Sequence, residues 1–174
     1  MTMDRGYISE VADVVRDTLA LKTPITLEEL IRAIEELGGR CIPGVKEEMG
    51  IEAQISTPSE EHSEYRFTIQ YLEGKPAKRI LFSIAHEVGH LVLHLLGENG
   101  TLLQDETFAR GMHTTQKELE ANEFAAALLM PAEEFILKCE EMVSGNKISI
   151  TKVAECFNVS VQAATVRGNV LGLW

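Results

Sequence analysis

The feature that most constrains this chain is the motif His86-Glu87-Val88-Gly89-His90, because H-E-x-x-H on a helix brings two imidazoles to one metal ion. Residues four apart lie on one face of a helix, about 6 Å apart along its axis. Glu87 lies beside such a metal, where it can accept a proton from a water molecule that the cation acidifies to a pKa of about 7. The motif therefore predicts a zinc-dependent peptidase and requires a helix at this point.

The residues around the motif support a helix over residues 79–96. Apolar residues recur there at helical spacing and would face the core, namely Leu81, Ala85, Val88, Val92 and Leu95. His86 and His90 fall outside this stripe, and Gly97 follows as a stop signal. Gly89 lies inside the helix, where it costs about 1 kcal/mol relative to Ala, so a packing or access reason is expected. The alternative is that both histidines are ordinary surface or core residues.

A catalytic zinc site takes three protein ligands, so the two histidines need a third partner. His94 is the nearest candidate, but it lies about 12 Å along the helix axis from His86, too far for one metal to join both. Proteins with a third His after H-E-x-x-H usually turn the chain at a Gly first, and residues 90–94 contain none. We therefore expect His94 beside the ligands or in the core, and a carboxylate from elsewhere as the third ligand.

The helix expected over residues 115–130 offers the carboxylates of Glu118, Glu120 and Glu123. At about 100° per residue, only Glu118 borders the apolar face of this helix. Asn122 lies one turn later, where its amide could orient a liganding side chain. Glu118 is thus the predicted third ligand. The alternative is that Glu118 only closes a capping box with Thr115.

The remaining pattern predicts an α+β fold with additional N- and C-terminal helices. Further helices are expected over residues 8–21, 26–37 (with a capping box at Thr26), 131–143, 150–157 and 160–171. Alternating apolar and polar residues over 51–55 and 65–71, together with 40–45, predict a small antiparallel sheet packed on the H-E-x-x-H helix. Residues 65–71 are expected to form an edge strand that takes an extended substrate by β-addition.

Composition narrows the class of protein further. We expect a single domain over residues 1–174, with residues 146–174 as a C-terminal helix pair packed on it. The net charge of −11 disfavours binding to nucleic acid or to an anionic membrane. The three cysteines are odd in number and widely spaced, and no secretion signal or membrane span is evident. A cytoplasmic protein is therefore expected, whereas its oligomeric state is open.

Two segments carry a resemblance to the ImmA/IrrE family of metallopeptidases. Residues 79–94, R-I-L-F-S-I-A-H-E-V-G-H-L-V-L-H, resemble the active-site helix of that family, and residues 118–131, E-L-E-A-N-E-F-A-A-A-L-L-M-P, resemble its second signature. The closing helix pair with Arg167 is similar as well. The resemblance implies a compact zincin-like metallopeptidase domain with one Zn²⁺ held by His86, His90 and Glu118. It also implies Glu87 as catalytic base and a helix-turn-helix repressor as the protein substrate.

Two other functions are compatible with the sequence. A zinc-binding regulator that acts by protein–protein interaction would keep the ligands and lose the chemistry, although Glu87 argues for catalysis. A DNA-binding regulator would use residues 150–171, which resemble a helix-turn-helix but carry few basic residues. A peptidase also needs a donor for the tetrahedral oxyanion, and the sequence leaves four candidates open, namely His113, Tyr65, Tyr71 and Arg79. His62 and His113 are otherwise expected in exposed loops.

Overall fold

The computed structural model describes residues 2–45, 51–58, 63–97, 101–103, 107–109, 115–144 and 147–174. Within these residues the helices are α1 (Arg5–Thr18), α2 (Leu27–Glu36), α3 (Ala77–His90), the π-helix η2 (Leu91–Leu95), α4 (Gln116–Leu129), α5 (Ala132–Glu141), α6 (Ile150–Cys156) and α7 (Val161–Val170). The strands are β1 (Gly39–Pro43), β2 (Ala53–Ser56), β3 (Phe67–Tyr71), β4 (Thr107–Ala109), β5 (Val143–Ser144) and β6 (Lys147–Ile148). The expected α+β class is confirmed, and each predicted helix is present close to its expected range.

Side-chain caps define where several of these helices begin. Thr26 and Glu29 form the predicted capping box at α2, in which each side chain accepts a backbone N–H of the other residue. Asp4 accepts the N–H of Gly6 at α1, and Ser160 accepts the N–H of Ala163 at α7. These caps satisfy N–H groups that have no partner within the helix.

The four-stranded sheet has the order β1-β3-β2-β4 and is mixed. β2 runs antiparallel to β3 and to β4, but β1 and β3 are parallel, so the antiparallel prediction is wrong for that pair. The reason is the strand order. β2 runs opposite to β1 but is not its neighbour in the sheet. β3 lies between the two and runs opposite to β2, so it is parallel to β1. Alternation of apolar and polar residues fixes which face is buried and carries no information about strand direction.

The prediction that residues 65–71 form an edge strand is also wrong. β3 pairs on both sides, with β1 and with β2, so its backbone groups are already used by the ladder. Among the described strands of this sheet, β1 and β4 are the edges. The short strand β4 and the hairpin of β5 and β6 were not expected, because strands of two or three residues leave almost no periodicity to read.

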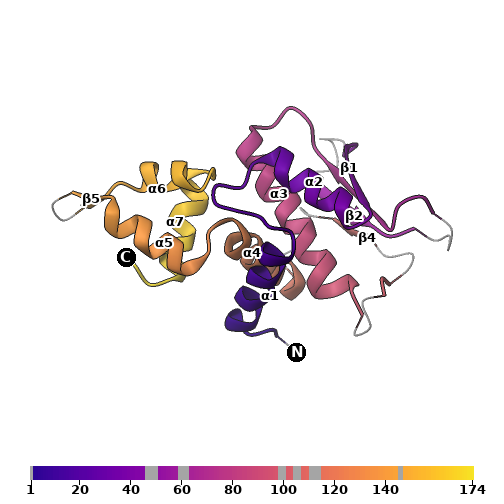
Figure 1. Cartoon of the computed structure of the whole chain (residues 1–174), viewed down its shortest axis with the longest axis horizontal. Helices are drawn as coiled ribbons and strands as arrows, with labels where there is room; N and C mark the ends of the chain where they lie inside the picture. The colour runs from indigo at the N-terminus through magenta and orange to yellow at the C-terminus, as the bar shows by residue number, and fades with distance from the viewer. Residues whose placement is uncertain are drawn as a thin grey trace.

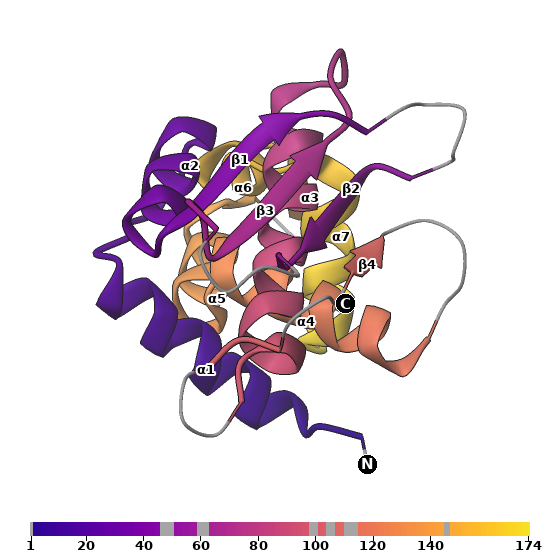
Figure 2. The ribbon, with the colours of Figure 1, turned by 90° about the vertical axis from the view of Figure 1, so that its right-hand side faces the viewer.

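Helix α3 lies at the centre of the molecule, between the sheet and α4 (Figures 1 and 2). The apolar positions expected to face the core are buried, including Leu81, Ala85 and Val88. The histidine face of α3 is buried as well, because α4 covers it. Helices α5, α6 and α7 lie on the opposite side of α4 from the sheet (Figure 1). None of the described helices is both long and apolar enough to cross a membrane.

Two arginines hold the C-terminal end of α4, the helix that carries Glu118. Arg16 of α1 donates to the carbonyl of Leu128 at 2.7 Å, and Arg167 of α7 donates to the carbonyl of Met130 at 3.0 Å. Both arginines are buried, although arginine seldom is unless it is paired. They satisfy carbonyls that the helix end leaves without a partner. The position of α4 is thereby fixed from both sides.

Candidate metal centre

Helices α3 and α4 bring the three predicted ligands to one point. His86 and His90 lie one turn apart on α3, and Glu118 lies in the first turn of α4. The two carboxylate oxygens of Glu118 lie 3.0 Å from His86 Nε2 and 2.9 Å from His90 Nε2. The two Nε2 atoms are 3.1 Å apart. One nitrogen from each histidine and a carboxylate thus converge, and the three residues could hold a metal ion.

The backbone and the side chain of Glu118 have different roles. Its N–H donates to Thr115 Oγ1 at 3.3 Å, so Thr115 does cap α4. Its carboxylate does not return to Thr115 to close a capping box but contacts the two histidines. The same residue therefore starts the helix through its main chain and leaves its side chain available as a ligand.

The site is buried but open on the side of Glu118. The side chains of His86 and His90 are 0% exposed, whereas that of Glu118 is 14% exposed. Burial, with a smaller effect of His86, lowers the pKa of His90 to about 3, so its imidazole is neutral near pH 7. Burial alone would raise the pKa of Glu118, but His86 and His90 outweigh it and lower the pKa. Neutral imidazole and ionised carboxylate are the forms that bind metal.

Each histidine has a second partner through its Nδ1 atom. His86 Nδ1 lies 3.0 Å from Asn122 Oδ1, as expected for an amide one turn after Glu118. His90 Nδ1 lies 3.0 Å from His94 Nδ1, and His94 Nε2 lies 3.1 Å from Glu120 Oε2. His94 therefore lies beside the candidate ligands and is not part of their cluster, as the axial distance predicted.

The prediction that only Glu118 borders the buried face of α4 missed Glu120, which is 4% exposed. Helical angles placed Glu120 on the outer face of α4. That face is covered in the fold, because the N–H of Met3 donates to Glu120 Oε1 at 2.9 Å and His94 contacts Oε2. Both neighbours come from distant parts of the chain, so no local pattern could show them.

Glu87, the predicted base, lies on α3 within the H-E-x-x-H turn and is fully buried. The candidate ligand His86 precedes it directly in the sequence, and the candidate ligand His90 follows three residues later. A carboxylate in this position is adjacent to the point where His86, His90 and Glu118 converge. Its role as a base stays a prediction that a substitution can test.

Gly89 lies where the backbone of α3 packs tightly against α4. A Cβ atom at this position would lie 3.1 Å from the Cα and from the carbonyl oxygen of Ala121, and 3.1 Å from the Phe124 ring. Two of these three atoms belong to backbone, so the helices themselves would have to separate. The expected reason for this glycine is therefore packing across the interface that joins the ligands.

We predict that Gly89→Ala destabilises the protein by up to about 2 kcal/mol and weakens metal binding. Overpacking costs about 1–3 kcal/mol, and the better helix propensity of Ala returns about 1 kcal/mol. The separation of α3 from α4 would move Glu118 away from the histidines. Urea unfolding and a zinc titration measure the two effects. A variant as stable as wild type with unchanged zinc affinity would show that the helices tolerate the extra carbon.

The candidates for an oxyanion donor are engaged elsewhere where the structure describes them. Arg79 forms an ion pair with Glu52 of the segment before β2. The Arg40 guanidinium lies over the Tyr65 ring, 5.0 Å from its centroid. Tyr71 is half-buried in β3, and burial raises the pKa of its hydroxyl. His62 and His113 lie outside the described residues, so the choice of a donor stays open.

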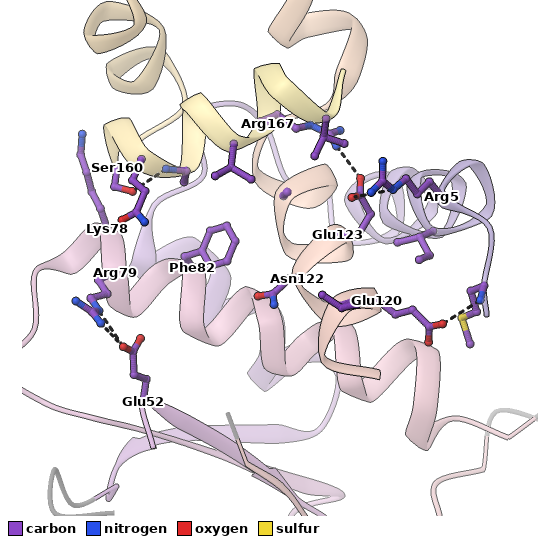
Figure 3. A pocket seen from close by; sticks show the side chains of 18 of the residues that line it. Arg5, Glu52, Lys78, Arg79, Phe82, Glu120, Asn122, Glu123, Ser160 and Arg167 are labelled. Atoms are coloured by element: carbon purple, nitrogen blue, oxygen red, sulfur yellow. Dashed lines mark hydrogen bonds and ion pairs between the residues drawn. The ribbon is translucent and has the colours of Figure 1, made fainter. Parts of the chain in front are cut away.

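A cleft of about 1060 Å³ runs along α3, α4 and α7 and borders the residues behind the metal ligands (Figure 3). Asn122 and Glu120 lie on its α4 wall. In Figure 3 the Arg79–Glu52 pair lies at one end of the cleft, Glu120 and Arg5 lie toward the other, and the Arg167–Glu123 pair lies between them. The wall also exposes apolar side chains, of which Leu119 is 52% and Val166 is 55% exposed.

Comparisons with known proteins agree with the geometry. The family model for Peptidase M78, described as the IrrE N-terminal-like domain, matches residues 47–169, well over half of the chain. A solved structure described as "Mycobacterium tuberculosis transcriptional regulator" is similar with a TM-score of 0.64 at 12% sequence identity, over 93% of this chain and 46% of that one. This chain thus spans about half the length of that protein, and the likeness shows a shared fold. A search of curated proteins finds no significant match.

Proposed function

This chain belongs to the Peptidase M78 family of IrrE N-terminal-like domains, and from that premise we propose that it is a zinc-dependent metallo-endopeptidase that cleaves a helix-turn-helix transcriptional repressor. Membership supports a function of the metallopeptidase type. The identity of the metal, the catalytic step and the substrate are the parts that the proposal adds.

The observation that carries the proposal is the convergence of His86, His90 and Glu118. In a tetrahedral site with ligand distances of about 2.0–2.1 Å, the ligand atoms lie about 3.3 Å from one another. Here Glu118 Oε2 lies 3.0 Å from His86 Nε2, Glu118 Oε1 lies 2.9 Å from His90 Nε2, and the two Nε2 atoms are 3.1 Å apart. Each of these contacts is within about half an ångström of that edge, with a different carboxylate oxygen facing each histidine. Two imidazoles and one carboxylate suit zinc better than calcium or magnesium, which prefer oxygen ligands only. Three ligands also leave the fourth position open.

The residues divide the chemistry between binding and proton transfer. When zinc is bound at these ligands, it polarises the peptide carbonyl and lowers the pKa of water. Glu87 accepts the proton of the attacking water and can return it to the leaving amine. The exposed edge of Glu118 marks the side from which substrate reaches the site.

The proposed substrate, a helix-turn-helix repressor, rests on the family resemblance. The ImmA/IrrE resemblance implies a repressor as the substrate. The similar solved structure is itself named as a transcriptional regulator, and that name gives no substrate. Direct DNA binding has less support, because Arg167 of the helix pair is buried against α4 and is not available to phosphate.

We predict that protein purified without added metal contains about one equivalent of zinc. Replacing both His86 and His90 by Ala should remove it, because one carboxylate alone cannot hold the ion. Elemental analysis of the two proteins at equal concentration measures this. Zinc at one equivalent in the double variant would place the metal elsewhere and overturn the assignment.

The substrate is tested by mixing the protein with a small helix-turn-helix repressor encoded next to it and following fragments by mass spectrometry. Fragments that appear with zinc and disappear with a chelator support the proposal. Stoichiometric binding without cleavage would instead favour a zinc-binding regulator that acts by protein–protein interaction.

A further inference from the structure

The second histidine of the motif is connected to a buried carboxylate through another histidine. His90 Nδ1 contacts His94 Nδ1 at 3.0 Å, and His94 Nε2 contacts Glu120 Oε2 at 3.1 Å. The side chains of His94 and Glu120 are 3% and 5% exposed. Glu120 Oε1 also accepts the N–H of Met3 at 2.9 Å and Gln116 Nε2 at 3.1 Å. The carboxylate is thus surrounded by donors, and its pKa is lowered by them despite its burial.

With Glu120 ionised and His94 neutral, the order of donors and acceptors from Glu120 to His90 is fixed. A carboxylate only accepts, so His94 must carry its proton on Nε2 and donate to Glu120. A neutral imidazole then has a lone pair on its other nitrogen, so His94 Nδ1 accepts. His90 must therefore carry its proton on Nδ1, which leaves the Nε2 lone pair directed at His86 and Glu118. Glu120 thus selects, through His94, the tautomer of His90 that a metal requires.

His86 has the same arrangement with a different partner. Asn122 Oδ1 lies 3.0 Å from His86 Nδ1, and an amide oxygen accepts a hydrogen bond. Both histidines therefore present Nε2 toward Glu118. The orienting group is a neutral amide for His86 and an anion acting through a second imidazole for His90.

We propose that His94 and Glu120 are positioning residues that hold His90 as the Nδ1–H tautomer and so raise the affinity of the site for its metal. The proposal rests on the metal-binding role of His90 given above. A hydrogen bond from the second nitrogen of a liganding histidine to a carboxylate fixes the ring and increases its basicity, and its loss costs about 10–100-fold in metal affinity.

The local backbone is shaped for this contact. The helix that carries the motif changes from α3 to the π-helix η2 directly after His90, and His94 lies within η2. Its wide turn is closed by a hydrogen bond from the N–H of Leu96 to the carbonyl of Leu91 at 3.0 Å. π-turns are rare and often lie at functional sites. Here the turn places the imidazole of His94 between His90 and Glu120.

The first test replaces His94 by Phe, which keeps a planar ring and removes both nitrogens. We expect zinc affinity, measured by competition with a chromophoric chelator, to fall about 10–100-fold. His94→Gln should recover most of it, because an amide can accept from His90 through oxygen and donate to Glu120 through nitrogen. Recovery by Gln and not by Phe distinguishes hydrogen bonding from filling of space.

Leu95→Ala is the matched control, because Leu95 is buried in the same π-helix and contacts no ligand through a polar atom. It should lower the midpoint of urea unfolding, because it leaves a cavity in the core, and leave zinc affinity within about twofold. A loss of affinity equal to that of His94→Phe would mean that the effect is only structural. Wild-type affinity in His94→Phe would overturn the proposal directly.

A spectroscopic readout independent of activity is the protonation of His94 in the zinc-loaded protein. ¹⁵N-labelled histidine should show a proton on His94 Nε2 and none on Nδ1. The opposite tautomer would contradict the relay. If wild-type protein binds no zinc at these ligands, the proposed function fails as a whole. If it binds zinc and His94 has no effect, only the relay fails.

Discussion

Glu87→Gln is expected to lower the rate of repressor cleavage by about 10²- to 10⁴-fold while zinc stays at about one equivalent. Gln has the shape of Glu but cannot accept the proton of the attacking water. The metal should be retained because Glu87 is not among the three converging residues. Single-turnover cleavage and elemental analysis on the same preparation separate the two effects. Cleavage at the wild-type rate would show that the base is another residue.

The second variant, Glu118→Gln, removes the negative charge of a proposed zinc ligand and leaves the proposed base Glu87 unchanged. Its two carboxylate oxygens contact both histidines, so zinc affinity should fall and cleavage should recover when zinc is added in excess. Excess zinc should not restore Glu87→Gln. If both variants respond to zinc in the same way, the division between ligand and base is wrong.

Arg167→Ala is expected to destabilise the fold by about 3–5 kcal/mol, a large share of the stability of a domain of this size. Arg167 is 2% exposed, donates to the carbonyl of Met130 and pairs with Glu123 at 3.0 Å. Its removal leaves both groups without their main partner in a poorly hydrated place. Arg5 lies 3.8 Å from Glu123 and can compensate only in part. Denaturant unfolding of wild type and variant measures the difference.

The control for Arg167 is an exposed ion pair. Lys138→Ala removes a pair with Glu141 on the surface of α5, where the side chains are 40% and 54% exposed. Such pairs contribute less than about 1 kcal/mol. A loss of similar size in both variants would mean that burial of Arg167 against α4 adds nothing to the stability of the fold.

The core of the site could be predicted from sequence because its residues lie on two regular helices. His86, Glu87 and His90 lie within about one turn of α3. Helical periodicity placed Glu118 beside the apolar face of α4, which packs against α3. Asn122 followed from the same periodicity. Each of these inferences needed only the geometry of one helix, and the structure brings the predicted ligands together.

The parts that could not be predicted depend on contacts between distant segments. Glu120 is buried because Met3 and His94 cover it, and neither contact leaves a trace near Glu120 in the sequence. The sequence shows Arg167 as a basic residue of a predicted helix. Its partners, the carbonyl of Met130 and the carboxylate of Glu123, depend on how α7 packs against α4. The parallel pairing of β1 with β3 depends on strand order, which alternation does not encode.

Every residue of α3 from Ser83 to His90 is buried, so the H-E-x-x-H turn has no face on which a replacement is free. In most enzymes a lost activity leaves the scaffold intact, and the old catalytic residues can then drift. Here the same positions fill the contact between α3 and α4, and a random substitution would leave a void or an unsatisfied charge in the centre of the molecule. Neutral drift in this turn therefore requires paired replacements that conserve volume and polarity. The packing of α3 against α4 and the proposed chemistry thus constrain the same residues, so selection for the fold alone would slow the loss of the motif.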